Sequence, residues 1–190
     1  MSIERWRCFV AISIGDGLRR DLRTAVDGWR GREDLAGLRW AGADAWHVTL
    51  AFLGSIDSAS VAGVVEHLAT VAEAHPATSF TTGGLGGFPA PARARVAWYG
   101  IENADGRLAR LAVDVTVALG LDASRPLRPH LTLARARREP VDLRPWLASA
   151  SAPTGVLAAD RLELVRSHLG RGPAQYETLA ALTLGVPAVV

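Results

Sequence analysis

The chain has 190 residues, of which 49% are hydrophobic and 21% are charged, and its formal net charge at pH 7 is only +2. These values are typical of an ordinary globular protein and argue against a disordered tail or a membrane protein. No apolar run approaches the roughly 20 residues of a membrane helix, and residues 1–7 lack a secretory apolar stretch, so we expect a cytoplasmic protein.

The first half of the chain contains signals for three strands and two helices. The apolar stretch 8–14 predicts a strand, and apolar residues at helical spacing predict a helix over 18–29. Residues 38–41 and 46–53 read as two strands joined by a turn. A second helix with an apolar face is expected over 61–71.

The second half repeats this scheme. Its glycine-rich stretch 83–87 predicts a flexible loop or a bulged strand end, and it lacks the GxxxxGK[ST] pattern of a phosphate-binding loop. The remaining signals predict, in order, a strand over 95–101, a helix over 108–119, a strand over 130–134, a short helix near 143–147, and strands over 161–167 and 176–184. Interleaved strands and helices favour an α+β fold.

A weak internal repeat accompanies this order of elements. Each half contains a strand–helix pair and one copy of the pattern His-x-Thr-Leu. No low-complexity linker separates the halves. We therefore expect a single domain over residues 1–190, built from two similar, pseudo-symmetric lobes that face each other across a cleft, with one motif from each lobe.

The two motifs are His47-Val48-Thr49-Leu50 and His130-Leu131-Thr132-Leu133. Two such motifs are expected by chance in a chain of this composition on the order of once in a thousand sequences. Because side chains alternate along a strand, each motif presents its histidine and threonine on one face and its two apolar residues on the other. Each motif therefore offers one imidazole and one hydroxyl to the cleft.

Two opposed imidazoles are suited to acid–base chemistry at phosphorus. The ordinary histidine pKa of ~6.5 lets a neutral ring accept a proton while a charged ring donates one. The hydroxyls of Thr49 and Thr132 can donate hydrogen bonds to phosphoryl oxygens and stabilise developing negative charge.

The remaining reactive side chains favour an anionic ligand over a metal. All 21 basic residues are arginine, whose planar fork suits phosphate, and several cluster around His130: Arg125, Arg128, Arg135, Arg137 and Arg138. The single cysteine, Cys8, is expected in the core. The histidines at 67, 75 and 168 form no metal-ligand pattern, so we expect neither a metal nor another cofactor.

These motifs resemble the paired His-x-Thr/Ser-x motifs of the 2H phosphoesterase superfamily. Within it, the chain is similar to the bacterial and archaeal RNA 2′,3′-cyclic phosphodiesterases, also called 2′-5′ RNA ligases (the LigT-like group). The resemblance runs nearly end to end. It covers Arg7-Cys8-Phe9-Val10-Ala11-Ile12, Trp40, Trp46 to Gly54, Phe88-Pro89, Val96-Ala97-Trp98, Arg128 to Arg135, Ser167-x-Leu169, Gly172 and Tyr176.

The resemblance implies a bilobal α+β fold with antiparallel sheets and both motifs in a central cleft. It implies metal-independent hydrolysis of a terminal 2′,3′-cyclic phosphate to a 2′-phosphate, with reversible 2′-5′ joining of RNA ends. Carried over to this chain, His130 activates water and His47 protonates the departing 3′-oxygen. The expected partner is RNA with a 2′,3′-cyclic phosphate end or a small cyclic nucleotide, and the expected state is a monomer.

Arg135 matches an arginine that follows the second motif in relatives, and it is a candidate phosphate-binding residue. Strict alternation would place it on the face opposite His130, so it reaches the cleft only if the strand ends or bulges near Ala134. Trp46 is expected in the core, and no base-stacking residue is identified. The alternative functions are a 2H enzyme for small cyclic phosphates or 2′-5′ oligonucleotides, and a non-catalytic RNA-binding module.

Overall fold

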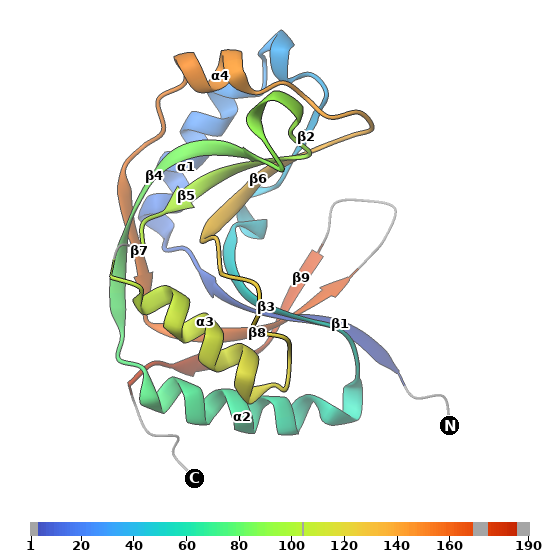
Figure 1. Cartoon of the computed structure of the whole chain (residues 1–190), viewed down its shortest axis with the longest axis vertical. Coiled ribbons are helices and arrows are strands. Elements are labelled where there is room, and N and C mark those ends of the chain that lie inside the picture. Colours follow the sequence, from blue (N-terminus) through green and yellow to red (C-terminus); the bar gives the residue numbers. More distant parts are fainter. Residues whose placement is uncertain (1–3, 104, 169–174, 186–190) are drawn as a thin grey trace.

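The computed structural model describes residues 4–103, 105–168 and 175–185. It is an α+β fold in which one curled antiparallel sheet carries helices at both ends (Figure 1). Leu169 and Gly172, two positions of the family resemblance, lie outside the described residues.

The sheet has nine strands, hydrogen-bonded in the order β7-β4-β5-β6-β3-β1-β8-β9, with β2 also paired to β6. The strands are β1 (Arg5–Ser13), β2 (Leu38–Trp40), β3 (His47–Asp57), β4 (Thr78–Phe88), β5 (Val96–Ile101), β6 (His130–Ala136), β7 (Gly155–Ala159), β8 (Arg161–His168) and β9 (Gln175–Thr183). The α-helices are α1 (Asp16–Trp29), α2 (Val61–Ala74), α3 (Arg107–Ala118) and α4 (Arg144–Ser149).

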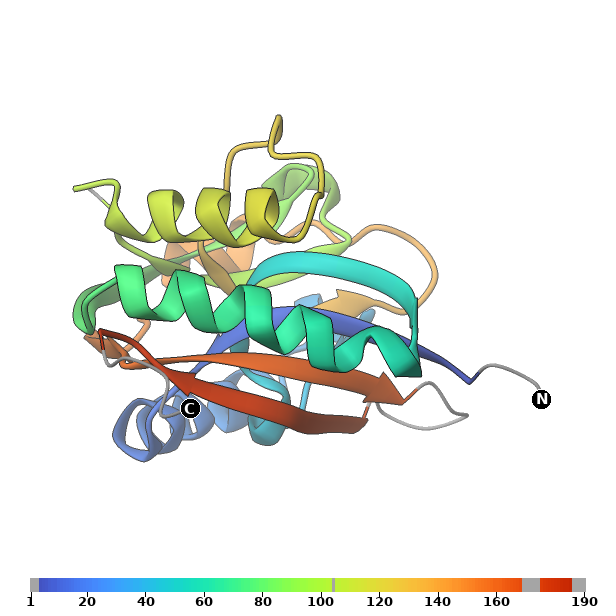
Figure 2. The same cartoon turned by 90° about the horizontal axis from the view of Figure 1, so that it is seen from below.

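Helices α2 and α3 run side by side, with α2 against β8 and β9 and α3 against β3 (Figure 2). All four helices contribute to one continuous core, to which the sheet adds Val48 and Leu131. A second, small apolar cluster is formed by Phe9, Ala11 and Val165. None of the helices in the described ranges is long and apolar enough to span a bilayer.

The α+β class and the antiparallel pairing predicted from the sequence are confirmed. The sheet joins two strand sets, β7-β4-β5-β6 and β3-β1-β8-β9, where β3 meets β6, and each set contains one motif. These sets do not coincide with the two halves of the sequence, because β8 from the second half pairs with β1 and β2 from the first half pairs with β6. Strand β7 was not predicted, because its five residues, Gly155–Ala159, show no clear alternation of apolar and polar residues.

The glycine-rich stretch is part of a strand, so the expectation of a flexible loop is wrong, whereas that of a bulge is confirmed. It lies within β4, and the register with β5 shifts between Thr82 and Leu85. A side chain at Gly86 would have its Cβ 2.1 Å from Cζ2 of Trp98. The small residue is therefore needed because the indole of Trp98 lies across the strand at this position.

Candidate active site

The two His-x-Thr motifs lie on the two strands that meet at the middle of the sheet. β3 and β6 are antiparallel neighbours, and Val48 is the partner of Leu131. Both of these side chains are fully buried in the core. Because side chains alternate along a strand, the flanking residues of both motifs point to the opposite side of the sheet, which we call the histidine face.

Four motif residues therefore share the histidine face. The antiparallel register sets His47 across from Thr132 and Thr49 across from His130, and all four are half-buried. The sequence prediction that residues 47 and 130 come together is thus met by the geometry. Neither threonine hydroxyl has a hydrogen-bond partner within the described ranges, so both can donate to a bound anion.

Arg135 joins these residues because β6 is bulged. Along β5 and β6, Trp98 is the partner of Thr132, whereas Ala97 is the partner of Ala134, so Leu133 is the extra residue. The extra residue reverses the alternation of side chains beyond it. Arg135 consequently shares the histidine face with Thr132, through the bulge near Ala134 that its predicted role requires.

The ring of His130 is oriented by its own backbone and by an aromatic neighbour. Its Nδ1 donates a hydrogen bond to the carbonyl oxygen of Arg128 at 2.6 Å. Phe88 contacts the ring edge to face, with 5.0 Å between the ring centroids. Trp98 supports Phe88 from a centroid distance of 5.4 Å. The Nδ1 bond fixes the tautomer in which Nε2 of the neutral ring is an acceptor.

His47 lies in a different, more apolar environment. Its ring stacks on Phe9, with a centroid distance of 4.6 Å and an interplanar angle of 26°, and it meets Tyr176 nearly perpendicularly at 5.1 Å. Phe9 is only 4% exposed, as expected of a core residue, but it belongs to the small cluster on the histidine face. Trp46 is buried in the main core, as predicted.

Burial and nearby positive charge keep both imidazoles neutral in the free protein. Burial lowers the pKa of His47 to about 4, and the charges of Arg135 and His130 act in the same direction, against a hydrogen bond to the backbone of Ala45. Burial also lowers the pKa of His130, with a further contribution from Arg135 and an opposing one from the Arg128 carbonyl. These couplings show that the three groups act within one electrostatic site.

An exposed aromatic residue that the sequence did not predict for the site lies beside the histidines. Phe52 is 71% exposed and is the partner of Phe9 across β1 and β3. In that register Ala51 pairs with Val10 and Thr49 with Ala11, so Leu50 is an extra residue. This bulge turns Phe52 toward the histidine face. Alternation alone would have placed Phe52 with Val48 and Leu50.

The other histidines have partners of their own. Nε2 of His75 is 2.8 Å from Asp114, and Nε2 of His168 is 2.8 Å from Glu177. Nδ1 of His67 is 2.7 Å from the carbonyl oxygen of Gly63. In the part of the chain that the structure describes, no three His, Cys, Asp or Glu side chains gather in a metal-binding arrangement.

Known proteins are similar to this chain in sequence and in architecture. The model of the family described as LigT like Phosphoesterase matches residues 12–98, which include the first motif. The RNA 2′,3′-cyclic phosphodiesterase of Thermotoga maritima is 28% identical over 166 residues, covering 86% of this chain and 87% of the relative. That of Archaeoglobus fulgidus is 31% identical over 136 residues, covering 70% of this chain and 74% of the relative. The chain belongs to this family of LigT-like phosphoesterases.

Solved structures of LigT-like phosphoesterases have the same fold. The apo crystal structure of E. coli LigT matches with a TM-score of 0.74 at 25% identity, covering 95% of this chain and 98% of that one. Family membership confirms the predicted class of enzyme, a phosphodiesterase.

Proposed function

We propose that this LigT-like phosphoesterase hydrolyses 2′,3′-cyclic phosphate ends of RNA to 2′-phosphates by metal-independent acid–base catalysis. The observation that carries the proposal is the convergence of two His-x-Thr pairs and Arg135 on one face of the sheet. The relatives named RNA 2′,3′-cyclic phosphodiesterase suggest the substrate.

His130 is assigned the role of general base. Its Nδ1–H donates to the carbonyl oxygen of Arg128, which leaves the lone pair of Nε2 free to accept a proton from water. The lowered pKa of His130 keeps the ring neutral at pH 7, which is the form that a base requires. Attack by the activated water at phosphorus then breaks the bond to the 3′-oxygen.

His47 is assigned the role of general acid, which requires a protonated ring. In the free protein its pKa of about 4 opposes this form. A bound phosphate anion opposes the effects of Arg135 and His130, because an adjacent negative charge favours an imidazolium. Substrate binding therefore raises the pKa of His47 and couples its protonation to the presence of the leaving group.

The remaining polar groups bind and stabilise the phosphate. The hydroxyls of Thr49 and Thr132 donate to the non-bridging oxygens, and the Arg135 guanidinium binds them as a charged fork. Donors and positive charge at this position stabilise the extra negative charge that develops as water attacks.

The exposed ring of Phe52 supports a nucleobase beside this phosphate. It lies next to Phe9, with a centroid distance of 6.1 Å, and Tyr176 is also exposed on the other side of Phe9. Unpaired RNA bases bind by stacking on such rings. This placement puts the terminal nucleoside on the His47 side, where its 3′-oxygen must leave.

The decisive experiment measures hydrolysis of an RNA with a 2′,3′-cyclic phosphate end, with assignment of the product phosphate and with EDTA present throughout. Wild type should yield the 2′-phosphate, and His47→Ala and His130→Ala should each reduce kcat at least about a hundredfold. Near-normal turnover by either folded variant, or a strict need for an added divalent cation, contradicts the proposal.

Two further comparisons in this experiment test the alternatives and the assigned roles. Faster turnover of small cyclic phosphates or 2′-5′ oligonucleotides than of RNA ends would favour those substrates. A 4-nitrophenyl phosphodiester needs no acid because its leaving group is stable as an anion. It should restore activity to His47→Ala but not to His130→Ala, and the opposite result would exchange the two roles.

The same site accounts for the joining of RNA ends when a 5′-hydroxyl takes the place of water. His130 then removes the proton of the attacking 5′-hydroxyl, and His47 protonates the departing 3′-oxygen, which leaves a 2′-5′ phosphodiester. Reversible 2′-5′ ligation is therefore an extension of the proposal, detected as a longer RNA when two ends are supplied at high concentration.

A further inference from the structure

A second arginine stands directly opposite Arg135 and has no role in the chemistry described so far. Arg39 of β2 is the partner of Arg135 of β6, and directly opposite residues point to the same face with Cβ atoms about 4.5–5.5 Å apart. Arg39 therefore lies on the histidine face. Both arginines are exposed.

No protein group in the described ranges neutralises this pair of charges. Neither guanidinium has a hydrogen bond or ion pair there, although other surface arginines do, such as Arg144 with Asp142 at 2.6 Å. Like charges placed directly opposite each other destabilise a sheet. An unneutralised arginine pair on the face that binds a phosphate indicates a place for another anion.

The pair extends the site outward from the histidines. Arg135 is three residues beyond Thr132, a distance of roughly 7 Å after allowance for the bulge. The charge of Arg135 lowers the pKa of both histidines. Arg39 lies beside Arg135 on β2, at this outer end of the histidine face.

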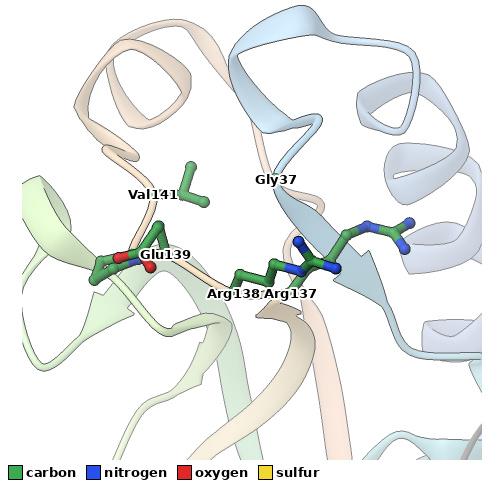
Figure 3. A pocket seen from close by; sticks show the side chains of 6 residues that line it. Gly37, Arg137, Arg138, Glu139 and Val141 are labelled. Carbon is green, nitrogen blue, oxygen red and sulfur yellow. The ribbon is translucent and has the colours of Figure 1, made fainter.

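Beyond the pair, the surface opens into a basic hollow. A depression of about 610 Å³ is lined by Gly37, Arg137, Arg138, Glu139, Pro140 and Val141 (Figure 3). Gly37 precedes β2 and Arg137 follows β6, and Nε of Arg137 donates to the carbonyl oxygen of Leu38 at 3.2 Å. The hollow thus continues from the strand ends that carry Arg39 and Arg135.

The shape of a nucleotide matches this arrangement. The base leaves the ribose at C1′ and the 5′-phosphate leaves through C4′, so the two groups diverge from the ring. With the base on Phe52 at one end of the histidine face, the 5′-phosphate extends toward the other end, where Arg39 and Arg135 lie.

We propose that Arg39 and Arg135 together bind the phosphodiester on the 5′ side of the terminal nucleotide, so that the enzyme favours an RNA chain over a free cyclic nucleoside phosphate. This inference rests on the proposed function. Arg39 then acts as a specificity residue, because it contacts the phosphodiester on the 5′ side and not the reacting phosphate. Arg135 contacts both phosphates.

The test compares two substrates that differ only at the 5′ side: adenosine 2′,3′-cyclic phosphate with a free 5′-hydroxyl, and the same nucleotide at the 3′ end of a dinucleotide. Wild type should favour the dinucleotide about tenfold or more in kcat/KM. In Arg39→Gln the ratio of the two kcat/KM values should fall to about one. The slope of log kcat/KM against log salt for the dinucleotide should become less steep by about 0.7.

The matched control is Arg23→Gln, which removes the same charge from an exposed position of α1 and should retain the wild-type ratio. A wild-type ratio near one, or an unchanged ratio in Arg39→Gln, would overturn the second phosphate site while leaving the proposed function intact. Thermal unfolding of both variants checks that they fold.

A binding measurement separates failure of the site from failure of the function. Calorimetry with adenosine 2′-phosphate and adenosine 2′,5′-bisphosphate requires no turnover. Wild type should bind the bisphosphate more tightly, and Arg39→Gln should bind both alike. If wild type hydrolyses neither cyclic substrate, the proposed function fails, and this comparison still decides whether the arginine pair binds a second phosphate.

Discussion

The protonation of the two catalytic candidates is set by their immediate neighbours. His47 lies against Phe9 and Tyr176, whereas His130 is held by the carbonyl oxygen of Arg128 and the edge of Phe88. The charge of Arg135 lowers the pKa of both rings. Two histidines in identical tetrapeptide motifs therefore titrate differently, and a single arginine links their titrations.

Arg135→Gln should weaken catalysis and move its pH dependence in a defined direction. Arg135 lowers the pKa of both histidines, so its removal raises both values. The acid limb of kcat/KM, which reports the coupled pair, should shift to higher pH. Loss of a charged hydrogen bond to phosphate should also reduce kcat/KM at the pH optimum by about tenfold.

Arg135→Lys is the matched control, because it keeps the charge and removes the planar fork. It should leave the acid limb near its wild-type position while still weakening substrate binding. NMR titration of the histidine rings in the free protein provides the direct measurement. An acid limb that moves to lower pH in Arg135→Gln would contradict the electrostatic role of this residue.

At the scale of elements, the motifs were predictable but the bulges beside them were not. Alternation within each tetrapeptide correctly placed His47 with Thr49 and His130 with Thr132. It failed beyond Leu50 and Leu133, where one extra residue reverses the faces. A bulge is defined by the pairing with the adjacent strand, so the sequence of one strand cannot reveal it.

The glycine-rich strand β4 illustrates the same limit. Glycines are typical of loops, and nothing local indicates that Gly86 instead makes room for an indole from β5. In the structure, Trp98 lies over Gly86 and supports Phe88, which contacts His130. The glycine thus belongs to a chain of contacts that ends at the proposed base.

Gly86→Ala should therefore disturb both stability and catalysis. The new Cβ would lie 2.1 Å from Trp98, so the indole must move, and such overpacking costs about 1–3 kcal/mol. Displacement of Trp98 and Phe88 should misalign His130 and lower kcat severalfold. Urea unfolding and steady-state kinetics measure the two effects.

Gly63→Ala in α2 is the matched control, because no atom lies within 4 Å of its added Cβ. Alanine should stabilise this helix by about 0.5–1 kcal/mol without changing kcat. If Gly86→Ala were as stable and active as wild type, the support of His130 through Trp98 would be refuted.

In the whole molecule, one sheet brings together motifs that lie far apart in the chain. Most of the strands and all four α-helices were expected near their observed positions, but the internal repeat did not predict that strands of the two halves are intermixed in the sheet. The order of strands was not predictable, because it depends on long-range pairing. The junction of β3 with β6 sets the site, and the strands that were not predicted, β7 and β4, lie at one edge of the sheet.

This junction also predicts how the protein responds to acid. The pKa of His47 is about 4 in the folded protein, against an ordinary value of 6.5, so the unfolded chain binds more protons between these values. The contribution of neutral His47 to the free energy of unfolding is fully present above pH 6.5 and is lost as the pH falls toward 4. The loss attributable to His47 should be about 2 kcal/mol at pH 5, and His130 acts in the same direction.

Urea unfolding of wild type and His47→Phe at pH 7 and pH 5 measures this effect. Phenylalanine retains an aromatic ring against Phe9 but cannot titrate, so the difference in unfolding free energy between the two pH values should shrink by about 2 kcal/mol. Asp142, with a pKa of about 2 beside Arg144, affects stability only at lower pH.

His67→Asn controls for loss of a histidine elsewhere, because His67 lies on the exposed side of α2. It should leave the wild-type difference between pH 7 and pH 5 intact. An equal difference in wild type and His47→Phe would show that His47 is not held neutral by the folded sheet. The proposed coupling requires that the pKa of His47 is low in the free protein and rises when a phosphate binds. That result would therefore also remove the basis for coupling acid catalysis to substrate binding.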